Sequence, residues 1–345
     1  MQKILLPLLL AAVISACTAQ DHYIQISGHA QGGVYAVKLN LKGSDLDPQA
    51  AKDSVEALLH RIDSTLSGYN RSSLLSRFNE GRPVLPDSLF LDMYAQAYGW
   101  WKRSEGALDF AAGPLYDAWG FGFRESRFPS DEAIRGILGS CGMRLLPPAL
   151  PISNDGLVHP DAIGNPSLNY NAIAQGYSCD LIAAFLRRHG VKDMLVDIGE
   201  IWCEGLNPSR RPWSVGVDRP EDREGESVAG DRGLSGIWST DGRPCGVVTS
   251  GNYRKFYIRD GRKYAHTIDP RSGYPVSHNL LSATIVSFRS ATEADALATW
   301  CMVEGEEKAK ALILSDGAIE GCLISGSENG EMEVWTSPGF VISNR

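Results

Sequence analysis

Two oxygen-bearing side chains, Asp295 and Thr299, stand four residues apart in the stretch ATEADALATW (291–300). Residues with this spacing share one face of a helix, so a helix here would place a carboxylate and a hydroxyl side by side. Both groups are hard oxygen ligands that suit Mg²⁺, with water and phosphate oxygens completing its shell. The same spacing also suits an exposed aspartate and a threonine that bonds its own helix, which is the more common arrangement.

A second polar stretch, YAHTIDPRSGYPVSHN (264–279), follows an alternating apolar run and contains His266 and Asp269. A histidine titrates near neutral pH and can act as a general base if a substrate proton lies within reach. The stretch is also typical of a polar loop that leaves a hairpin, which is the commoner interpretation when it is taken alone.

Two further segments could bind an anion. Thr249, Ser250 and Gly251 end a predicted strand, where hydroxyls and a close backbone can meet a phosphate or a ring edge. The helix predicted over 171–190, with Gly176 in its first turns, could offer free backbone amides. Each segment also suits an ordinary turn or helix start, and neither has the glycine pattern of a dinucleotide fingerprint or a P-loop. GxSxG and HExxH motifs are absent, so serine-hydrolase and zinc-protease functions have no support.

Hydrophobic periodicity predicts the elements that must position these residues. Apolar residues at helical spacing predict helices over 47–67, 86–106, 131–142, 171–190 and 290–305. In the last of these, Ser290 and Glu293 have the spacing of a capping box. Alternating runs predict strands within 24–41, 193–199, 213–218, 245–250 and 280–288, and a hairpin over 255–266 that turns at Asp260–Gly261. The charged, glycine-rich residues 219–236 predict a solvated loop.

The predicted strands gather into runs, which favours an α+β fold with antiparallel sheet over a doubly wound sheet. With 345 residues the chain is long enough for one large domain or two of ordinary size. Its net charge of −8 argues against a nucleic-acid partner, which needs a basic face to neutralise phosphates. A small phosphate-bearing ligand stays possible, because a local cation or a bound metal can supply the positive charge.

Six cysteines follow Cys17 at wide and irregular spacings: Cys141, Cys179, Cys203, Cys245, Cys301 and Cys322. CxxC and zinc-ligand spacings are absent. An exported chain could pair these cysteines, but their apolar contexts favour small buried residues.

The N-terminal stretch MQKILLPLLLAAVISAC has Lys3, a short apolar run and small residues before Cys17. It resembles the signal peptide and lipobox of bacterial lipoproteins, with an apolar run too short to span a bilayer. That resemblance predicts removal of residues 1–16 and a lipid on Cys17. Residues 17–23 would form a tether, 24–345 the folded domain, and the protein would be anchored on the extracytoplasmic, periplasmic face of a membrane. A plain signal peptide with a chance cysteine is the alternative.

The order of the segments is more specific than any one of them. The chain resembles the ApbE family of FAD:protein FMN transferases in LSGYNRSSLLSRFNEG (66–81), ALDFAAGPLYDAWGFG (107–122), NAIAQGYSCD (171–180), LVDIGEIWCEGLNP (195–208), VTSGNYRKFY (248–257), YAHTIDPRSGYPVSHNLLSATIV (264–286) and ATEADALATW (291–300). By this resemblance the fold comprises two intertwined α+β subdomains with mainly antiparallel sheets and flanking helices. A ligand cleft lies between the subdomains in this ApbE-like or T-fold-like arrangement.

The resemblance also implies an activity. Family members use Mg²⁺ to move the FMN half of FAD onto a Thr or Ser hydroxyl of an acceptor protein, and they release AMP. The acceptors are flavin-carrying redox subunits that face the periplasm or the cell exterior. We therefore expect Mg²⁺ as cofactor, FAD as substrate, and an acceptor flavoprotein and the membrane as partners.

Roles follow residue by residue. The family's metal ligands fall on the backbone carbonyl of Ala174 and on Asp295 and Thr299. The catalytic histidine falls on His266, with Asp269 as its orienting partner or as a rival base. Contacts with FAD are expected from Tyr69, Ala174, Asp180, Thr249, Ser250, Gly251, His266 and Asp269.

The chain departs from the family pattern in three places. Residues 169–172 (NYNA) replace a frequent Asp-x-Gly-Gly, Gln175 replaces the usual lysine, and DIGE (197–200) is shorter than the common DIGGE. Loss of a lysine removes a cation, which affects the contacts expected for the AMP half.

Two alternatives use the same residues differently. An FAD pyrophosphatase would take water as the nucleophile and release FMN and AMP, and the sequence does not separate it from a transferase. A non-catalytic FAD-binding lipoprotein is disfavoured by the presence of Asp295, Thr299 and His266.

Overall fold

The computed structural model describes residues 21–122, 128–220, 233–253, 256–259, 262–327 and 331–343. Within these residues eight strands form one sheet whose neighbouring strands all run antiparallel. Their order across the sheet is β1 (Tyr23–Ala30), β2 (Gly33–Asn40), β3 (Met194–Asp197), β4 (Ile201–Glu204), β7 (Cys245–Gly251), β12 (Leu280–Ser287), β13 (Ile319–Gly326) and β14 (Met332–Thr336). The predicted α+β class with antiparallel sheet is confirmed.

Three smaller sheets accompany the large one in the described part of the chain. They are β15 (Ile342–Ser343) with β6 (Leu234–Ser239) and β5 (Ser214–Asp218), the pair β8 (Phe256–Arg259) and β9 (Arg262–Ala265), and the pair β10 (Ile268–Asp269) and β11 (Tyr274–Pro275). The predicted hairpin strands β8 and β9 pair with Arg259 opposite Arg262, while the turn at Asp260–Gly261 lies outside the described residues.

The loop predicted over 219–236 was wrong at its C-terminal end. Strand β6 begins at Leu234, because this segment pairs with both β5 and β15. Residues 221–232 lie outside the described residues.

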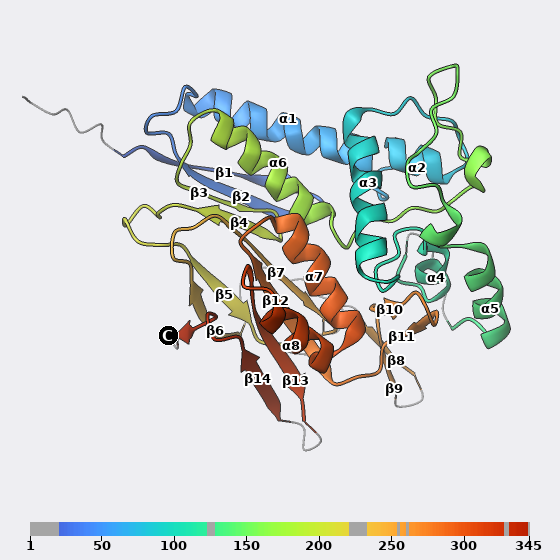
Figure 1. Cartoon of the computed structure of the whole chain (residues 1–345). Helices are drawn as coiled ribbons and strands as arrows, with labels where there is room; N and C mark the ends of the chain where they lie inside the picture. Colours follow the sequence, from blue (N-terminus) through green and yellow to red (C-terminus); the bar gives the residue numbers. More distant parts are fainter. Residues whose placement is uncertain are drawn as a thin grey trace, which may run out of the picture.

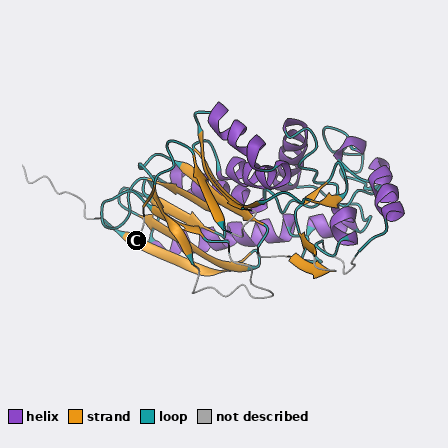
Figure 2. Ribbon diagram, turned by 90° about the horizontal axis from the view of Figure 1, so that it is seen from below, coloured by secondary structure: helices purple, strands orange, loops and turns teal. Residues whose placement is uncertain are grey.

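The helices fall into two groups (Figure 1). Four belong with the large sheet: α1 (Pro48–Leu66), α6 (Ala174–Arg188), α7 (Ala291–Glu304) and α8 (Glu306–Ser315). Four others stand beyond one end of it: α2 (Leu74–Asn79), α3 (Ser88–Arg103), α4 (Gly113–Ala118) and α5 (Asp131–Ser140), with short 3₁₀ turns at Met143–Leu145 and Asp161–Ile163. Figure 2 shows the same division from below, with the large sheet on one side and mostly helices and loops on the other.

Alternation along the central strands builds a core on both faces of the sheet. Trp202 packs in a cluster with residues of α1 and α6, whereas its neighbour Cys203 packs with the small β5–β6–β15 sheet. Val248 likewise joins the helical side, and Val247 the opposite side. Because successive strand residues point to opposite faces, the central strands β4 and β7 are apolar on both sides and are covered on both faces.

The chain passes between the two regions more than once, as the predicted intertwined subdomains require. After α1 it enters the helical region, returns at α6, and enters that region again through β8–β11. The indole of Trp119, just after α4, donates a hydrogen bond to the Gly273 carbonyl at 2.8 Å, and the Tyr274 hydroxyl donates to Asp131 at 2.7 Å. Segments far apart in sequence therefore share one structural unit.

The expected N-terminal features are only partly visible. Residues 1–16 and Cys17 lie outside the described residues. Strand β1 begins at Tyr23, and the Leu41 amide donates to the His22 carbonyl at 2.8 Å, so the sheet starts before the expected tether ends. None of the helices in the described ranges combines the length and the apolar character needed to cross a membrane.

Candidate active site

The first turn of α6 rests directly on α7 at Gly176. A Cβ atom on Gly176 would lie 2.3 Å from the Ala291 carbonyl oxygen and 2.8 Å from the Asp295 Cβ. Only a residue without a side chain permits this approach. The Gly176 amide donates to Asp295 Oδ2 at 3.0 Å, so the free amide predicted at this helix start binds a carboxylate of the chain itself.

The three predicted metal-binding groups meet where α6, α7 and the end of β7 converge. Ala174 is the first residue of α6, and its carbonyl accepts a hydrogen bond from the Ser178 hydroxyl at 2.7 Å. Thr299 lies one turn after Asp295 on α7, with its Oγ1 3.4 Å from Ser250 Oγ at the end of β7. The predicted helix and strand ends therefore bring these groups into one place.

Asp295 is 4% exposed, and no cation lies within salt-bridge distance of it in the described ranges. Burial raises the pKa of this carboxyl well above its usual range, with a further contribution from the charge of Asp180, while the Gly176 amide acts in the opposite direction. A buried carboxylate without a counter-charge is costly, because charge is poorly solvated there. A divalent cation would supply that charge.

The donor set also fits Mg²⁺. A carboxylate, a hydroxyl and a backbone carbonyl are all hard oxygen ligands, and Mg²⁺ usually completes its shell with water and phosphate oxygens. In the described residues no three His, Cys, Asp or Glu side chains form a metal-binding group. The predicted set contains only one such side chain, so it depends on the hydroxyl and carbonyl oxygens.

The ends of β7 and β12 place hydroxyls beside this point. Thr249 Oγ1 lies 2.9 Å from Thr284 Oγ1 on β12, and a Cβ on Gly251 would lie 2.3 Å from the Tyr253 ring. The next residue, Asn252, accepts a hydrogen bond from the Thr267 hydroxyl at 2.6 Å. That buried bond ties the end of β7 to the neighbour of His266, a link that the sequence alone did not indicate.

His266 follows β9 and is half-buried, with its ring edge-on to Phe121 at a centroid distance of 6.3 Å. Phe121 also stacks on Tyr257 of β8 at 4.9 Å. Aromatic packing therefore helps to place the histidine predicted to act as the base.

Asp269 has a different partner from the one expected. Both of its carboxylate oxygens accept from the Arg271 guanidinium, at 2.9 and 3.0 Å, and Arg271 also pairs with Glu304 at the end of α7. Both oxygens of this carboxylate are therefore engaged by a charge-assisted, two-point contact with Arg271. The roles of Asp269 as a rival base, as the orienting partner of His266 and as a contact of FAD stay predictions.

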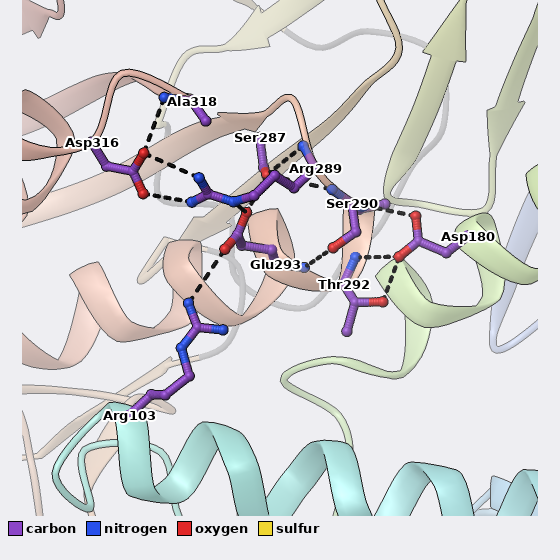
Figure 3. Close-up of polar contacts among 10 residues, drawn as sticks. Arg103, Asp180, Ser287, Arg289, Ser290, Thr292, Glu293, Asp316 and Ala318 are labelled. Atoms are coloured by element: carbon purple, nitrogen blue, oxygen red, sulfur yellow. Dashed lines mark hydrogen bonds and ion pairs between the residues drawn. The ribbon is translucent and has the colours of Figure 1, made fainter.

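Asp180 also has a structural partner that sequence reasoning missed (Figure 3). Its carboxylate accepts from the amides of Ala291 and Thr292, both at 2.8 Å, and from the Thr292 hydroxyl at 2.5 Å. These amides are the first of α7, where a negative charge is stabilising. Asp180 thereby fastens α6 to α7, and its contact with FAD stays a prediction.

The predicted capping box at the start of α7 forms only on one side. Ser290 Oγ accepts from the Glu293 amide at 3.0 Å, as expected. The Glu293 carboxylate instead accepts from Ser287 Oγ at 2.5 Å, from Arg289 Nε at 2.6 Å and from Arg103 Nη2 at 3.4 Å (Figure 3). It therefore joins α7 to the end of α3.

A comparison with known families agrees with this arrangement. The model of the ApbE family matches residues 31–323. This chain belongs to the ApbE family. It is 30% identical to the FAD:protein FMN transferase of Haemophilus influenzae over 308 residues, which cover 87% of this chain and 86% of that protein. It is also 30% identical to the FAD:protein FMN transferase of Escherichia coli K12 over 84% of this chain and 80% of that protein.

Solved structures of ApbE proteins share the fold. The apo form of the Pseudomonas stutzeri flavinyl transferase ApbE matches with a TM-score of 0.76 and 33% identity, covering 93% of this chain and 96% of that one. The flavin transferase ApbE of Vibrio cholerae matches with a TM-score of 0.75 and 28% identity, covering 93% and 99%. The ApbE-like α+β fold is thus shown for almost the whole chain.

Two departures from the ApbE pattern contact each other. The side-chain amide of Gln175 donates to the Ile198 carbonyl at 2.9 Å, inside the shortened DIGE turn. A Cβ on Gly199 would lie 2.7 Å from Gln175 Nε2. Gln175 therefore holds the turn between β3 and β4, and a long cationic side chain would need a different path here.

A third departure lies beside a predicted ligand contact. Tyr69 is 65% exposed, and its hydroxyl accepts from the Asn171 amide at 3.3 Å, in the segment that leads into α6. Tyr69, which is predicted to contact FAD, therefore contacts one of the residues that depart from the ApbE pattern.

A cavity of about 510 Å³ lies next to the residues that follow Asp269. It lies among Pro270, Arg271 and residues of α3, α4 and α5, and Asp295, Thr299 and His266 do not line it. The position of the nucleotide thus stays a prediction.

Proposed function

We propose that this chain is a Mg²⁺-dependent FAD:protein FMN transferase, which moves FMN from FAD to a Thr or Ser hydroxyl of an acceptor protein and releases AMP. The observation that supports it most is the buried Asp295, whose charge no described cation balances, at the junction of α6, α7 and β7. The chain is also about 30% identical to proteins named FAD:protein FMN transferase, a name that specifies FAD as the donor and a protein as the acceptor.

Asp295, the Thr299 hydroxyl and the Ala174 carbonyl would hold the metal ion. When bound, Mg²⁺ would neutralise negative charge on the pyrophosphate oxygens. The chain's own contribution is the fixed position of these donors. The Gly176 amide holds one oxygen of Asp295, and Asp180 fixes the start of α7.

In the proposed reaction the acceptor hydroxyl attacks the phosphorus of the FMN half, and the bond from that phosphorus to the AMP phosphate breaks. His266 would accept the proton of the hydroxyl. The Thr267–Asn252 hydrogen bond ties the residue after His266 to the end of β7, so the base and the hydroxyls of Thr249 and Ser250 are positioned by one link. The Arg271 bridge between Asp269 and Glu304 fastens the loop after His266 to α7.

The test uses the full chain in detergent with FAD and Mg²⁺, with and without a candidate acceptor subunit. The expected result is acceptor-dependent AMP release and an acceptor mass increased by one FMN. AMP and free FMN without any acceptor would instead show a pyrophosphatase, and FAD binding without AMP would show a carrier.

His266→Ala tests the base. The transfer rate should fall about a hundredfold if His266 accepts the proton. A rate close to that of the unchanged protein would assign proton transfer to another group.

We also propose that the chain is an exported lipoprotein anchored through Cys17 on the extracytoplasmic face. The lipobox-like residues before Cys17 support this, and the sheet begins only a few residues later, at Tyr23. Replacing Cys17 with alanine should abolish incorporation of a labelled fatty acid and release the protein from the membrane fraction. Retained labelling would contradict the anchor.

A further inference from the structure

Two cysteines face each other in the middle of the large sheet. Cys203 on β4 and Cys245 on β7 are direct partners in the antiparallel register, and their sulfur atoms are 3.7 Å apart. We propose that Cys203 and Cys245 form a disulfide bond when the chain folds in an oxidising environment. This proposal does not depend on the transferase activity.

The backbone already has the geometry that the bond requires. Opposed residues of an antiparallel pair have Cα atoms about 4.5–5.5 Å apart, and disulfides join residues whose Cα atoms are about 4.4–6.8 Å apart. The sulfurs are 3.7 Å apart and must close to about 2.05 Å, a change that rotation of two side chains can provide. The strands therefore need not move.

The positions of the other cysteines favour a bond between Cys203 and Cys245. Both side chains are fully buried in an apolar cluster that includes Leu195 and Val247. Cys322 belongs to the same cluster, but it lies on β13, and β12 separates that strand from β7. Of the cysteines that the structure describes, Cys203 and Cys245 are the two in sulfur–sulfur contact.

Burial also determines when the bond can form. The contact with Cys245 and the loss of solvent raise the pKa of Cys203 well above its usual range, so the folded protein keeps this group as a thiol. Thiolates, and not thiols, perform disulfide exchange. Oxidation must therefore precede closure of the sheet, as it can for a chain that folds after export.

The oxidant is a disulfide of the kind held by glutathione or by a thiol–disulfide exchange protein. The thiolate of one cysteine attacks that disulfide and releases one oxidant thiol. The thiolate of the second cysteine then attacks the mixed disulfide at the first cysteine's sulfur and releases the second oxidant thiol. Two electrons pass to the oxidant, and the two protons lost by the cysteines balance the two thiols released.

The bond would constrain the unfolded chain. Its ends are 42 residues apart in sequence, and they enclose β5 and β6. A loop of this length gives a loss of unfolded-state entropy that corresponds to a rise of about 5 °C in the melting temperature of a chain of this size.

The experiment refolds the full chain from denaturant in reduced or in oxidised glutathione, blocks free thiols, and digests without reductant. The oxidised sample should yield a Cys203–Cys245 cross-linked peptide and melt about 5 °C above the reduced sample. Six alkylated thiols other than Cys17 in the oxidised sample, or a cross-link to Cys322, would overturn the proposal. Because both samples are the natural chain, no variant has to fold.

Variants sharpen the result. Cys203→Ala and Cys245→Ala should each abolish the cross-link and make the melting temperature independent of the redox buffer. Cys301→Ala is the matched control, because Cys301 is equally buried but lies on α7, and it should keep both the cross-link and the shift. A redox-dependent shift that survives in Cys203→Ala would contradict the assignment.

Discussion

Glu293 and Asp295 stand two residues apart on α7, and their exposures are 5% and 4%. Glu293 is surrounded by donors: the hydroxyl of Ser287 and the guanidinium groups of Arg289 and Arg103. Asp295 has the Gly176 amide and, in the described ranges, no cation. One helix therefore carries one buried carboxylate whose charge is balanced within the protein and another whose charge is not.

The difference separates a structural group from a ligand. Arg289 also pairs with Asp316 on the loop before β13, at 2.5 Å, so the Glu293 network joins the start of α7 to two other parts of the chain. A buried ion pair costs desolvation energy, but removing one partner costs more because it leaves the other unpaired. Asp295 bears the desolvation cost without a partner, which is expected where a bound ion completes the site.

Of the variants that distinguish these two carboxylates, Asp295→Asn should have the largest effect on activity. We expect transfer of FMN to fall about a thousandfold, because the metal would lose its only charged ligand. Stability measured without metal should stay the same or rise, since the change removes a buried uncompensated charge. Turnover and a thermal melt check both points. Unchanged turnover would end the metal assignment, and an unfolded variant would show that this charge is structural.

Glu293→Gln is the complementary change on the same helix. The free energy of unfolding should fall by about 1.5–3 kcal/mol, because the buried Glu293 loses its charge-assisted hydrogen bonds, while the half-exposed Arg289 and Arg103 regain water. Urea unfolding measures the loss, and turnover per folded molecule should stay close to that of the unchanged protein. Full stability in this variant would show that the network contributes little.

Addition of Mg²⁺ should act on only one of these carboxylates. At a hundred times its Kd, a ligand that binds only the folded state stabilises it by about 2.7 kcal/mol. The melting temperature of the unchanged protein and of Glu293→Gln should therefore rise with Mg²⁺, and a chelator should reverse the rise. An equal rise in Asp295→Asn would place the ion elsewhere.

Asp180→Asn tests the smallest effect in this series. Asparagine keeps one acceptor oxygen at the start of α7 but removes the charge, so we expect a loss of about 1–2 kcal/mol in urea unfolding. Because Asp180 fixes the helix that bears Asp295, Mg²⁺ affinity should weaken about tenfold.

The matched control for this change is Asp53→Asn, which alters an exposed aspartate of α1. It should leave stability and Mg²⁺ affinity unchanged. If Asp180→Asn behaves like this control, Asp180 does not position α7.

Local pattern was enough to predict α1, α3 and α7, whose ends fall within a few residues of the predicted ones. Strand β6 was missed because its charged, glycine-rich surroundings hide a pairing with β5 and β15. Helix α8 was missed as a separate element. It begins directly after Gly305, whose φ of 85° ends α7 and starts a new direction.

Some residues of the candidate site could likewise be predicted from local sequence, and others could not. The spacing of Asp295 and Thr299 is local and could be recognised, whereas the partners of Asp180 are 111 and 112 residues away in sequence. No periodicity reports such a contact. Arg271 was visible in the same motif as Asp269, two residues later, but its pairing depends on a turn that the sequence does not specify.

The late place of α7 in the sequence determines when the fold can form during synthesis. Among the strands of the large sheet β1 and β2 are synthesised first, whereas β7, β12 and the helix that bears Thr299 come from the last third of the chain. Contacts between such distant segments form slowly, because a long loop must close before they stabilise anything. A nascent chain therefore lacks a finished sheet and a finished site until most of it has emerged from the ribosome.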